Sequence, residues 1–352
     1  MKRIVFFTPS LNIGGVERVF LTYADALIRL GYDVSYLVCK KESNQQMQLP
    51  EKLKIVSLGV KQLRSSIIPL IRFFKTNDVD VFITGGDVPN VLSILSNKLA
   101  CSKAKVIISH HNYFNIERNA LLSKIFFHLF YNRAHRVLSV SDGITNMLSN
   151  QGVSKRKLAT LYNPVDLNSI LDLGNVDLNL RLPANFLLFL GRLGEVKNLP
   201  FLFDSFALLT HELPSIELVL VGDGPMKTLL VEKAEALKLN EKIHFLGVLP
   251  NPFPVMKAAS AVILPSFSEA LPTIILESFA FHKTVIATPT NGAKDLLENG
   301  ELGYLSHSFD NLTEFAELIK RGLSNPISSE KLSQKVSTFN VDSKVKELEK
   351  LF

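Results

Sequence analysis

The feature that most limits the fold is an alternation of short apolar runs with longer segments of helical periodicity, which runs through the chain twice. It predicts strands joined by crossover helices, and therefore parallel sheets covered by helices on both faces. The strands of the first series are expected at Ile4–Thr8, Val34–Cys39, Ile55–Leu58, Val81–Thr84, Val106–Ser109, Arg136–Val140 and Leu158–Leu161. Those of the second series are expected at Phe186–Gly191, Glu217–Val221, Ile243–Leu246, Ala261–Leu264, Thr284–Ala287 and Gly303–Leu305. The predicted fold class is α/β, with two Rossmann-like, doubly wound domains.

The two series are separated by a stretch rich in Asn and Asp that lacks a strong period. It predicts an N-terminal domain over 1–165, a linker over 166–184, a second domain over 185–325 and a helical tail over 326–352. A chain of 352 residues is long enough for two such domains. The cleft between them is the expected ligand site.

Positive charge is concentrated in the first half of the chain. Residues 1–165 hold 22 Lys and Arg against 10 Asp and Glu, a net +12, whereas the rest holds 17 against 23, a net −6. A basic half points to an anionic partner, although a solvated basic face explains the same count. The basic residues are scattered, show no nucleic-acid-binding motif and come with no Trp. We therefore expect no nucleic acid as a partner, and an anionic membrane surface stays a candidate.

The sequence also indicates the cellular compartment in which the protein is expected. No apolar run approaches the roughly 20 residues of a membrane span. The chain starts with basic residues followed by an apolar run. This run is too short for a signal peptide, and we expect it to form a strand. Cys39 and Cys101 give neither a disulfide framework nor a metal-ligand spacing. We therefore expect a cytoplasmic protein without a metal site.

The stretch from Pro265 to Glu277 joins an apolar strand to a helix through a short loop. Pro272 is expected in the first turn of that helix, where a missing N–H costs nothing. A helix N-terminus favours an anion, and the carboxylates Glu269 and Glu277 lie beside it. An anionic ligand that carries hydroxyl groups, such as a sugar nucleotide, fits this pair. Any α/β crossover can carry acidic residues, so the neighbouring loops must support the interpretation.

Two other loops at strand ends combine glycine with charge. Gly191 and Arg192 follow a strand, and Lys197 comes five residues after the Arg. Arg offers a bidentate contact to phosphate oxygens and Lys adds a point charge, so together they are candidates for holding a diphosphate. Gly222 permits close approach of the backbone to a ligand, and Asp223 is expected to cap the following helix.

The first series contributes a glycine turn and a histidine pair. Gly14 and Gly15 lie between the first strand and its helix, but the pattern is not G-x-G-x-x-G and no acidic residue marks a ribose site, which argues against NAD. His110 and His111 end another strand. Neighbours on an extended chain point to opposite sides, so one of the two is expected to face a ligand.

Together these motifs resemble the family 4 glycosyltransferases of the GT-B fold, in which two Rossmann-like domains face each other across a cleft. The resemblance covers nearly the whole chain in the family's order and rests on Gly14-Gly15-Val16-Glu17-Arg18, Ser109-His110-His111-Asn112, Val140-Ser141, Asn163-Pro164-Val165-Asp166, Gly191-Arg192 with Lys197-Asn198, Gly222-Asp223-Gly224-Pro225, and Pro265-Ser266 through Glu269 to Glu277. The sequence departs from the family at Ala270, where a Gly often follows the Glu.

The resemblance implies a retaining glycosyltransferase that needs no metal and no cofactor, because the nucleotide-sugar is a substrate. Arg192 and Lys197 would hold the diphosphate, Glu277 the ribose, and Glu269 the transferred sugar. His111 would match the family's histidine near that sugar, with His110 as its rival. The other positions implied at the donor site are Gly14, Gly15, Gly191, Gly222, Ala270, Leu271 and Pro272, with Asn163 and Asp223 as further candidates. The final helix would return to the N-terminal domain.

The acceptor is expected to be a lipid-linked glycan or a surface polysaccharide. The segment Arg118–Arg136 mixes apolar and basic residues in the manner of an interfacial membrane helix, and a core helix has the same pattern.

Two other functions stay open. A sugar-nucleotide epimerase of GT-B-like fold would need acid/base carboxylates in the cleft, and a non-catalytic sugar-nucleotide-binding protein would lack the histidine and Glu269. A UDP-sugar is the favoured donor.

Overall fold

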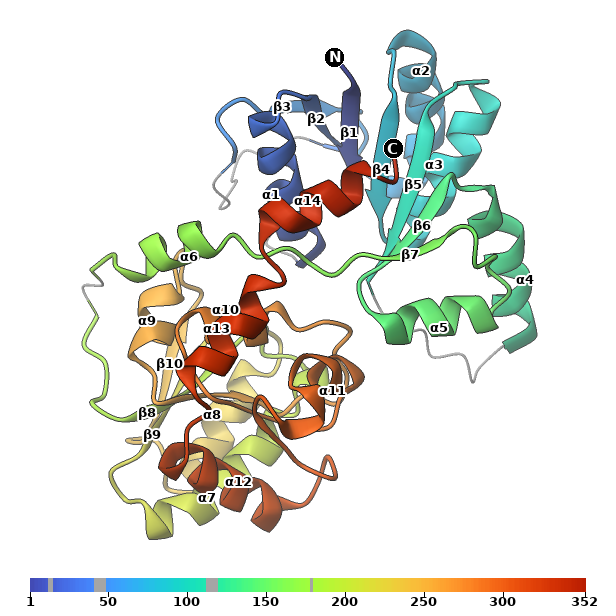
Figure 1. Ribbon diagram of the computed structural model, residues 1–352. Coiled ribbons are helices and arrows are strands. Elements are labelled where there is room, and N and C mark those ends of the chain that lie inside the picture. The colour runs from blue at the N-terminus through green and yellow to red at the C-terminus, as the bar shows by residue number, and fades with distance from the viewer. Residues whose placement is uncertain (12–14, 41–48, 112–119, 178–179) are drawn as a thin grey trace. The chain divides into compact units, whose positions relative to one another are not determined.

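The computed structural model describes residues 1–11, 15–40, 49–111, 120–177 and 180–352. They form two compact units, and each has its own parallel sheet (Figure 1). Unit 1 comprises Met1–Pro164 and Asn340–Phe352, and unit 2 comprises Val165–Phe339. No helix of the described ranges is both long and apolar enough to span a membrane.

Within its described part, unit 1 is built on a seven-stranded sheet of order β3-β2-β1-β4-β5-β6-β7. Its strands are β1 (Arg3–Phe7), β2 (Asp33–Val38), β3 (Lys54–Ser57), β4 (Val81–Gly85), β5 (Lys105–His110), β6 (Arg136–Ser139) and β7 (Leu158–Thr160). Its helices are α1 (Gly15–Arg29), α2 (Ile67–Thr76), α3 (Asp87–Leu99), α4 (Ala120–Phe130), α5 (Asp142–Asn150) and α14 (Val341–Glu349), with 3-10 turns η1 (Leu63–Ser66) and η3 (Tyr131–Arg133). Helix α1 ends where Gly31 adopts a φ of 89° and the Tyr32 N–H bonds to the Leu27 carbonyl.

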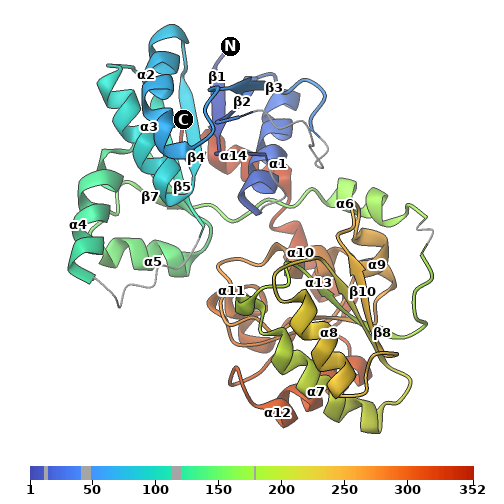
Figure 2. The same ribbon diagram turned by 180° about the vertical axis from the view of Figure 1, so that it is seen from behind.

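Helices cover the sheet of unit 1 on two faces. Helices α1 and α14 pack on one face, where Ile4, Phe6 and Ile107 join their apolar residues in a single core. Helices α2 and α3 lie on the other face (Figure 2). There Phe74 of α2 contacts Phe82 of β4, with ring centroids 4.7 Å apart. Successive residues of a strand point to opposite faces, so neighbours at the end of β5 face different helices.

Unit 2 holds, in its described part, a six-stranded sheet of order β10-β9-β8-β11-β12-β13. Its strands are β8 (Phe186–Leu190), β9 (Glu217–Val221), β10 (Ile243–Gly247), β11 (Ala261–Leu264), β12 (Val285–Ala287) and β13 (Tyr304–Leu305). Its helices are α6 (Leu167–Gly174), α7 (Leu199–Glu212), α8 (Lys227–Ala236), α9 (Phe253–Ala258), α10 (Thr273–Ala280), α11 (Asn291–Leu296), α12 (Leu312–Ser324) and α13 (Ser329–Ser337), with 3-10 turns η4 (Glu195–Lys197) and η5 (Glu298–Gly300).

The strand order in both sheets fixes where a ligand is expected to bind. In unit 1 the order reverses between β1 and β4, and in unit 2 it reverses between β8 and β11. Loops leaving the carboxyl ends of two such strands diverge and leave room for a ligand. In unit 2 these two loops are the Gly191–Asn198 loop and the Pro265–Pro272 loop, which both carry predicted site residues.

The structure differs from the sequence analysis in three segments. The stretch expected to be a linker contains helix α6, which contacts α9 and α10. The tail is divided, because α13 contacts α10 of unit 2 whereas α14 contacts α1 of unit 1. The segment Arg118–Arg136 is not one continuous helix, because α4 ends at Phe130 and is followed by η3.

Candidate active site

Two loops of unit 2 are tied together at the carboxyl edge of its sheet. They follow β8 and β11, which are hydrogen-bonded neighbours. The Phe267 N–H donates to the Val196 carbonyl at 2.8 Å, so the Pro265–Pro272 loop is fixed directly to the turn that carries Lys197. Predicted site residues that lie far apart in the sequence therefore lie side by side.

Lys197 and Glu269 form the central contact of this edge. The Lys197 ammonium lies 2.5 Å from Glu269 Oε1, and the two side chains are 24% and 14% exposed. The hydroxyl of buried Ser266 donates to the same oxygen at 2.7 Å. Within the described residues Oε2 has no partner. The carboxylate is therefore held by one oxygen and can accept from a ligand with the other.

The backbone beside Glu269 offers further donors. Helix α10 begins at Thr273, so Pro272 stands in the N-cap position and not in the first turn as predicted. The N–H groups of Ala270 and Leu271 bond to no acceptor in the described parts of the chain. Free N–H groups ahead of a helix are suited to phosphate or sugar oxygens. Glu277 lies within α10, where it is 7% exposed.

Arg192 lies in the same loop as Lys197 but makes no ion pair among the described residues. Its side chain is exposed. Its own carbonyl accepts from the Gly194 N–H at 2.9 Å, which closes a tight turn. The structure thus brings together Lys197 and Glu269, whereas Arg192 is presented to solvent.

The glycines of the loop after β9 have a role that the sequence analysis did not predict. A Cβ on Gly222 would lie 1.9 Å from the Gly191 carbonyl oxygen, and one on Gly224 would lie 2.4 Å from the Leu193 carbonyl oxygen. Both distances are far below any real contact, so these glycines allow two loops to pack against each other. Their first function is close approach to a neighbouring loop.

Asp223 does not cap the following helix, and that prediction was wrong. Its Oδ1 accepts from the N–H of the next residue, Gly224, at 2.8 Å. Helix α8 starts later, at Lys227, with Met226 in the N-cap position. Asp223 therefore stabilises the turn between the strand and the helix.

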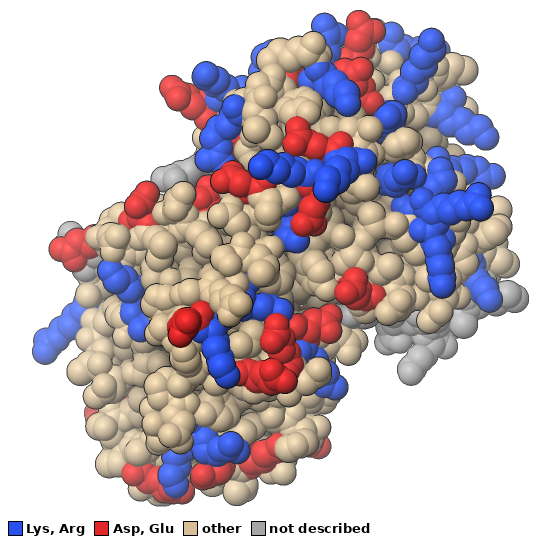
Figure 3. Space-filling view, viewed as in Figure 1, with Lys and Arg blue, Asp and Glu red and all other residues tan. Residues whose placement is uncertain are grey.

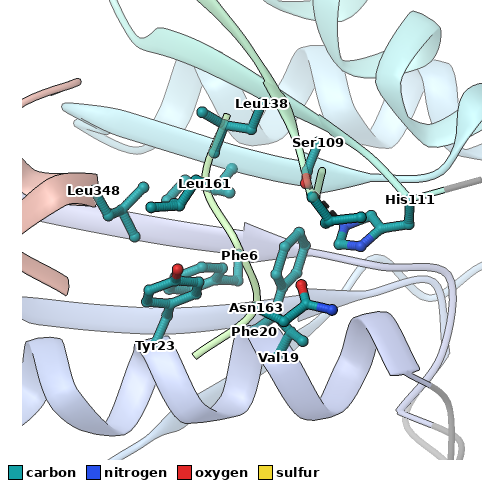
Figure 4. Close-up of a pocket in the computed structure, with 12 residues that line it drawn as sticks. Phe6, Val19, Phe20, Tyr23, Ser109, His111, Leu138, Leu161, Asn163 and Leu348 are labelled. Carbon is teal, nitrogen blue, oxygen red and sulfur yellow. Dashed lines mark hydrogen bonds between the residues drawn. The ribbon is translucent and has the colours of Figure 1, made fainter. Parts of the chain in front are cut away.

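In unit 1, His111 lines a small cavity beneath α1 (Figure 4). Its Nε2 lies 2.8 Å from the Ser109 hydroxyl, and its ring meets Phe20 edge-on. Burial, with a smaller contribution from His110, lowers the pKa of His111 to about 3, so the ring is neutral near pH 7. The cavity, about 10 Å³ and enough for one water, is lined by Phe6, Val19, Phe20, Tyr23, Ile83, Ser109, His111, Leu138, Val140, Leu161, Asn163 and Leu348.

Asn163 contributes a further polar group to this cavity (Figure 4). The residue is 7% exposed, and its Oδ1 has no hydrogen-bond partner in the described part of the chain. A buried carbonyl oxygen without a partner is costly. A water molecule in the cavity would satisfy it.

His110 points to the opposite face of the sheet. It is 1% exposed, and its Nδ1 lies 3.2 Å from both the Tyr131 hydroxyl and Asp87 Oδ1. Tyr131 also donates to Asp87 at 3.3 Å, and burial together with Asp87 raises the pKa of Tyr131. His110 therefore joins β5, α3 and η3, and His111 is the histidine that reaches the cavity.

The glycine turn of unit 1 is described only in part, because Gly14 lies outside the described residues. Asn112, which follows the histidine pair, also lies outside them. Gly15 starts α1, and a Cβ there would meet no atom within 4 Å. The sequence analysis assigned no role to Ser266, although the spacing Ser-x-x-Glu, which is also that of a capping box, brings a serine and a glutamate into the same turn. No sequence pattern around Tyr131 indicated its contacts with His110 and Asp87.

The two Rossmann-like units, with charged loops at the strand-order reversal of the second, have the architecture of the GT-B glycosyltransferases, whose solved structures share this fold. Two family models match the chain: the one described as Glycosyltransferase Family 4 matches residues 13–169, and the one described as Glycosyl transferases group 1 matches residues 176–338. The chain thus belongs to the group 1, family 4-like glycosyltransferases.

Relatives with known names agree with this assignment. A Campylobacter jejuni enzyme named N-acetylgalactosamine-N,N'-diacetylbacillosaminyl-diphospho-undecaprenol 4-alpha-N-acetylgalactosaminyltransferase is 26% identical, over 87% of this chain and 86% of its own. A second C. jejuni protein, an alpha-1,4-N-acetyl-D-galactosaminyltransferase whose name also includes PP-undecaprenol, is 29% identical over 87% and 84%.

Solved structures share the fold. A glycosyltransferase of Rickettsia africae superposes with a TM-score of 0.82 at 21% identity, over 99% of this chain and 97% of that one. HepE of Anabaena, solved in complex with UDP-glucose, superposes with a TM-score of 0.81 at 18% identity, over 100% of both chains.

Proposed function

We propose that the protein transfers a sugar, with retention of anomeric configuration, from a nucleotide-diphosphate donor to a lipid-linked or surface-polysaccharide glycan. The observation that carries the proposal is the contact between Lys197 and Glu269 at the strand-order reversal of unit 2. It places a cation suited to phosphate beside a carboxylate suited to sugar hydroxyls.

Each donor group then has a partner. Lys197 and Arg192 bind the diphosphate, and their charge offsets the charge that develops as it leaves, so the proposal includes no metal and no cofactor. Glu277 binds the ribose hydroxyls, and Oε2 of Glu269 accepts from a hydroxyl of the transferred sugar. Gly15, which the family resemblance assigns to the donor site, would let the backbone approach the diphosphate closely. A UDP-sugar is favoured because HepE, which has the same fold, was solved with UDP-glucose.

The reaction needs no nucleophile from the protein. The acceptor oxygen forms a bond to the anomeric carbon on the face from which the bond to the diphosphate breaks. The acceptor proton passes to the leaving phosphate oxygen, which yields a nucleoside diphosphate and a glycoside of unchanged configuration. His111, neutral because its pKa is about 3, offers a hydrogen bond near the sugar without adding charge.

The acceptor class is supported by the C. jejuni relatives, whose names include an undecaprenol diphosphate carrier. Such an acceptor lies in a membrane, and we propose that unit 1 touches the cytoplasmic face of an anionic bilayer. Part of the segment Arg118–Arg136 lies outside the described residues, but Ile125 and Leu129 of α4 are 45% and 44% exposed. Asn132 accepts from the Ser154 N–H at 2.8 Å, which ties the end of this helix to the loop that carries Lys155–Lys157.

The charge of unit 1 fits such a surface. Burial lowers the pKa of His135, and the charges of Lys105, Arg136 and Lys157 lower it further. Lys and Arg side chains gather on the right-hand part of unit 1 in Figure 3. Sedimentation with anionic vesicles at low salt tests this contact, and a protein that stays in the supernatant would exclude it.

A product assay tests the proposed reaction. Purified protein is given UDP-, GDP- and ADP-sugars in turn, with an undecaprenyl-diphosphate-linked glycan or an oligosaccharide, and with a chelator in a parallel series. A glycoside of retained configuration, formed equally with chelator, is the expected result. A free nucleotide-sugar epimer as the product would support an epimerase, and tight donor binding without turnover would support a binding protein.

A further inference from the structure

Glu269, the carboxylate proposed to bind the donor sugar, is held by the hydroxyl of a buried serine, and the backbone of that serine is held by a buried threonine. Ser266 and Thr288 are both fully buried. The Ser266 hydroxyl donates to Glu269 Oε1 at 2.7 Å, and the Thr288 hydroxyl donates to the Ser266 carbonyl at 2.5 Å. Thr288 directly follows β12, so a residue at the end of this strand fixes the backbone of the Pro265–Pro272 loop.

The same support continues to the backbone of Glu269. The Gly292 N–H donates to the Glu269 carbonyl at 3.1 Å. A Cβ on Gly292 would lie 2.7 Å from the Ala270 carbonyl oxygen, so the first turn of α11 packs against the Pro265–Pro272 loop without space for a side chain. The main chain and one side-chain oxygen of Glu269 are thus fixed by residues that are themselves buried.

This arrangement selects one oxygen of the carboxylate. Lys197 and Ser266 both bind Oε1. A carboxylate oxygen has two acceptor sites, so these two donors fill Oε1, whereas Oε2 keeps its own sites for a ligand. A buried serine hydroxyl is costly unless it is bonded, and the Glu269 oxygen is the one acceptor that Ser266 has among the described residues.

We infer that Ser266 is a positioning residue: its hydroxyl fixes Glu269 Oε1 and so presents Oε2 to a hydroxyl of the transferred sugar. The inference rests on the proposed function, because it assigns the donor sugar to Glu269. Ser266 itself touches no reacting atom. Its loss is therefore expected to weaken transition-state stabilisation and not nucleotide binding.

The test compares Ser266→Ala with Ser268→Ala, a change at an exposed serine of the same loop that makes no hydrogen bond in the described structure. We expect Ser266→Ala to lower kcat about 10- to 100-fold, as for loss of one positioning hydrogen bond, with the KM for the donor and the Kd for UDP unchanged within about twofold. Ser268→Ala should behave as wild type. Ser266→Thr keeps the hydroxyl and should restore most of the activity.

A crystal structure of Ser266→Ala gives a readout that does not depend on turnover. The expected result is a Glu269 side chain that leaves its position beside Lys197 or occupies more than one rotamer. An unmoved Glu269 with a normal kcat would overturn the inference. If the wild-type protein transfers no sugar, the proposed function fails, and the position of Glu269 in the variant still decides whether Ser266 holds it.

Discussion

The ammonium of Lys197 lies 2.5 Å from Glu269 Oε1 although 72 residues separate them. Each residue follows a different strand, and the strands are neighbours in the sheet. We expect Lys197→Ala and Glu269→Ala each to lower kcat/KM by about 100-fold or more, because each removes a charge placed for the donor. Transfer assays at saturating acceptor measure this.

The same two variants should remain folded. Both side chains are partly exposed, so we expect Lys197→Ala to lower the free energy of unfolding by about 1 kcal/mol. Glu269→Ala should lower it by about 1–3 kcal/mol, because the buried Ser266 hydroxyl loses its acceptor. Urea denaturation followed by circular dichroism gives both values. Near-normal turnover in both variants would refute the assignment of the site.

Glu277 offers a test of the ribose contact. Glu277→Gln keeps the size of the side chain within α10 but loses the charge. Hydrogen bonds to a charged group contribute about 1.5–3 kcal/mol, so the Kd for UDP should rise about 10- to 100-fold. Calorimetric titration measures it, with Glu232→Gln on α8, an exposed carboxylate, as the matched control. An unchanged Kd would remove Glu277 from the donor site.

The strands and both sheets could be predicted because their signal is local. Apolar runs such as Ala261–Leu264 are short, buried on both faces and followed by a turn, and the structure confirms them within a residue or two. Helix α6 gave no such signal, since Ile170 and Gly174 are its only residues classed as buried in the described structure. Its one local mark is Asp166, which caps it by accepting from the Ser169 N–H.

Pairings between side chains could not be predicted in the same way. Lys197 and Glu269 were each expected at the donor, but their contact depends on the strand order, which periodicity does not encode. The choice between His110 and His111 depended on which face of β5 carries α1. Gly222 was interpreted from its general freedom, whereas its neighbour Gly191 decides its role.

Gly222→Ala should disrupt the packing between the loops that follow β8 and β9. Its Cβ would lie 1.9 Å from the Gly191 carbonyl oxygen, so the backbone must move. We expect unfolding to become easier by about 1–3 kcal/mol and donor affinity to fall. Gly194→Ala is the matched control, because a Cβ there meets nothing within 4 Å and its φ of −123° suits alanine. Equal melting temperatures for the two variants would contradict this account.

Tyr131→Phe should destabilise unit 1 without touching the donor site. Tyr131 is buried and its hydroxyl bonds to both His110 and Asp87, so its removal takes one hydrogen-bond partner from each of them. We expect a loss of about 1–3 kcal/mol in the free energy of unfolding. Tyr162→Phe loses a hydroxyl bonded to Asp142 at an exposed position and should cost about 0.5 kcal/mol or less. Equal losses would show that the buried network contributes no more than a surface contact.

His111 predicts a pH dependence with a definite sign. Its pKa is lowered to about 3 in the folded protein, by burial and then by His110, whereas an unfolded histidine titrates near 6.5. The unfolded chain therefore binds an extra proton between these values, and stability falls as the pH is lowered from about 6.5 toward 3. Above pH 6.5 the histidine is neutral in both states, so it adds no pH dependence to the free energy of unfolding.

Urea denaturation of the wild type and of His111→Gln at pH 5 and pH 7.5 measures the effect, and we expect the variant to lose less stability on acidification. An identical loss in both proteins would show that other groups carry the acid sensitivity.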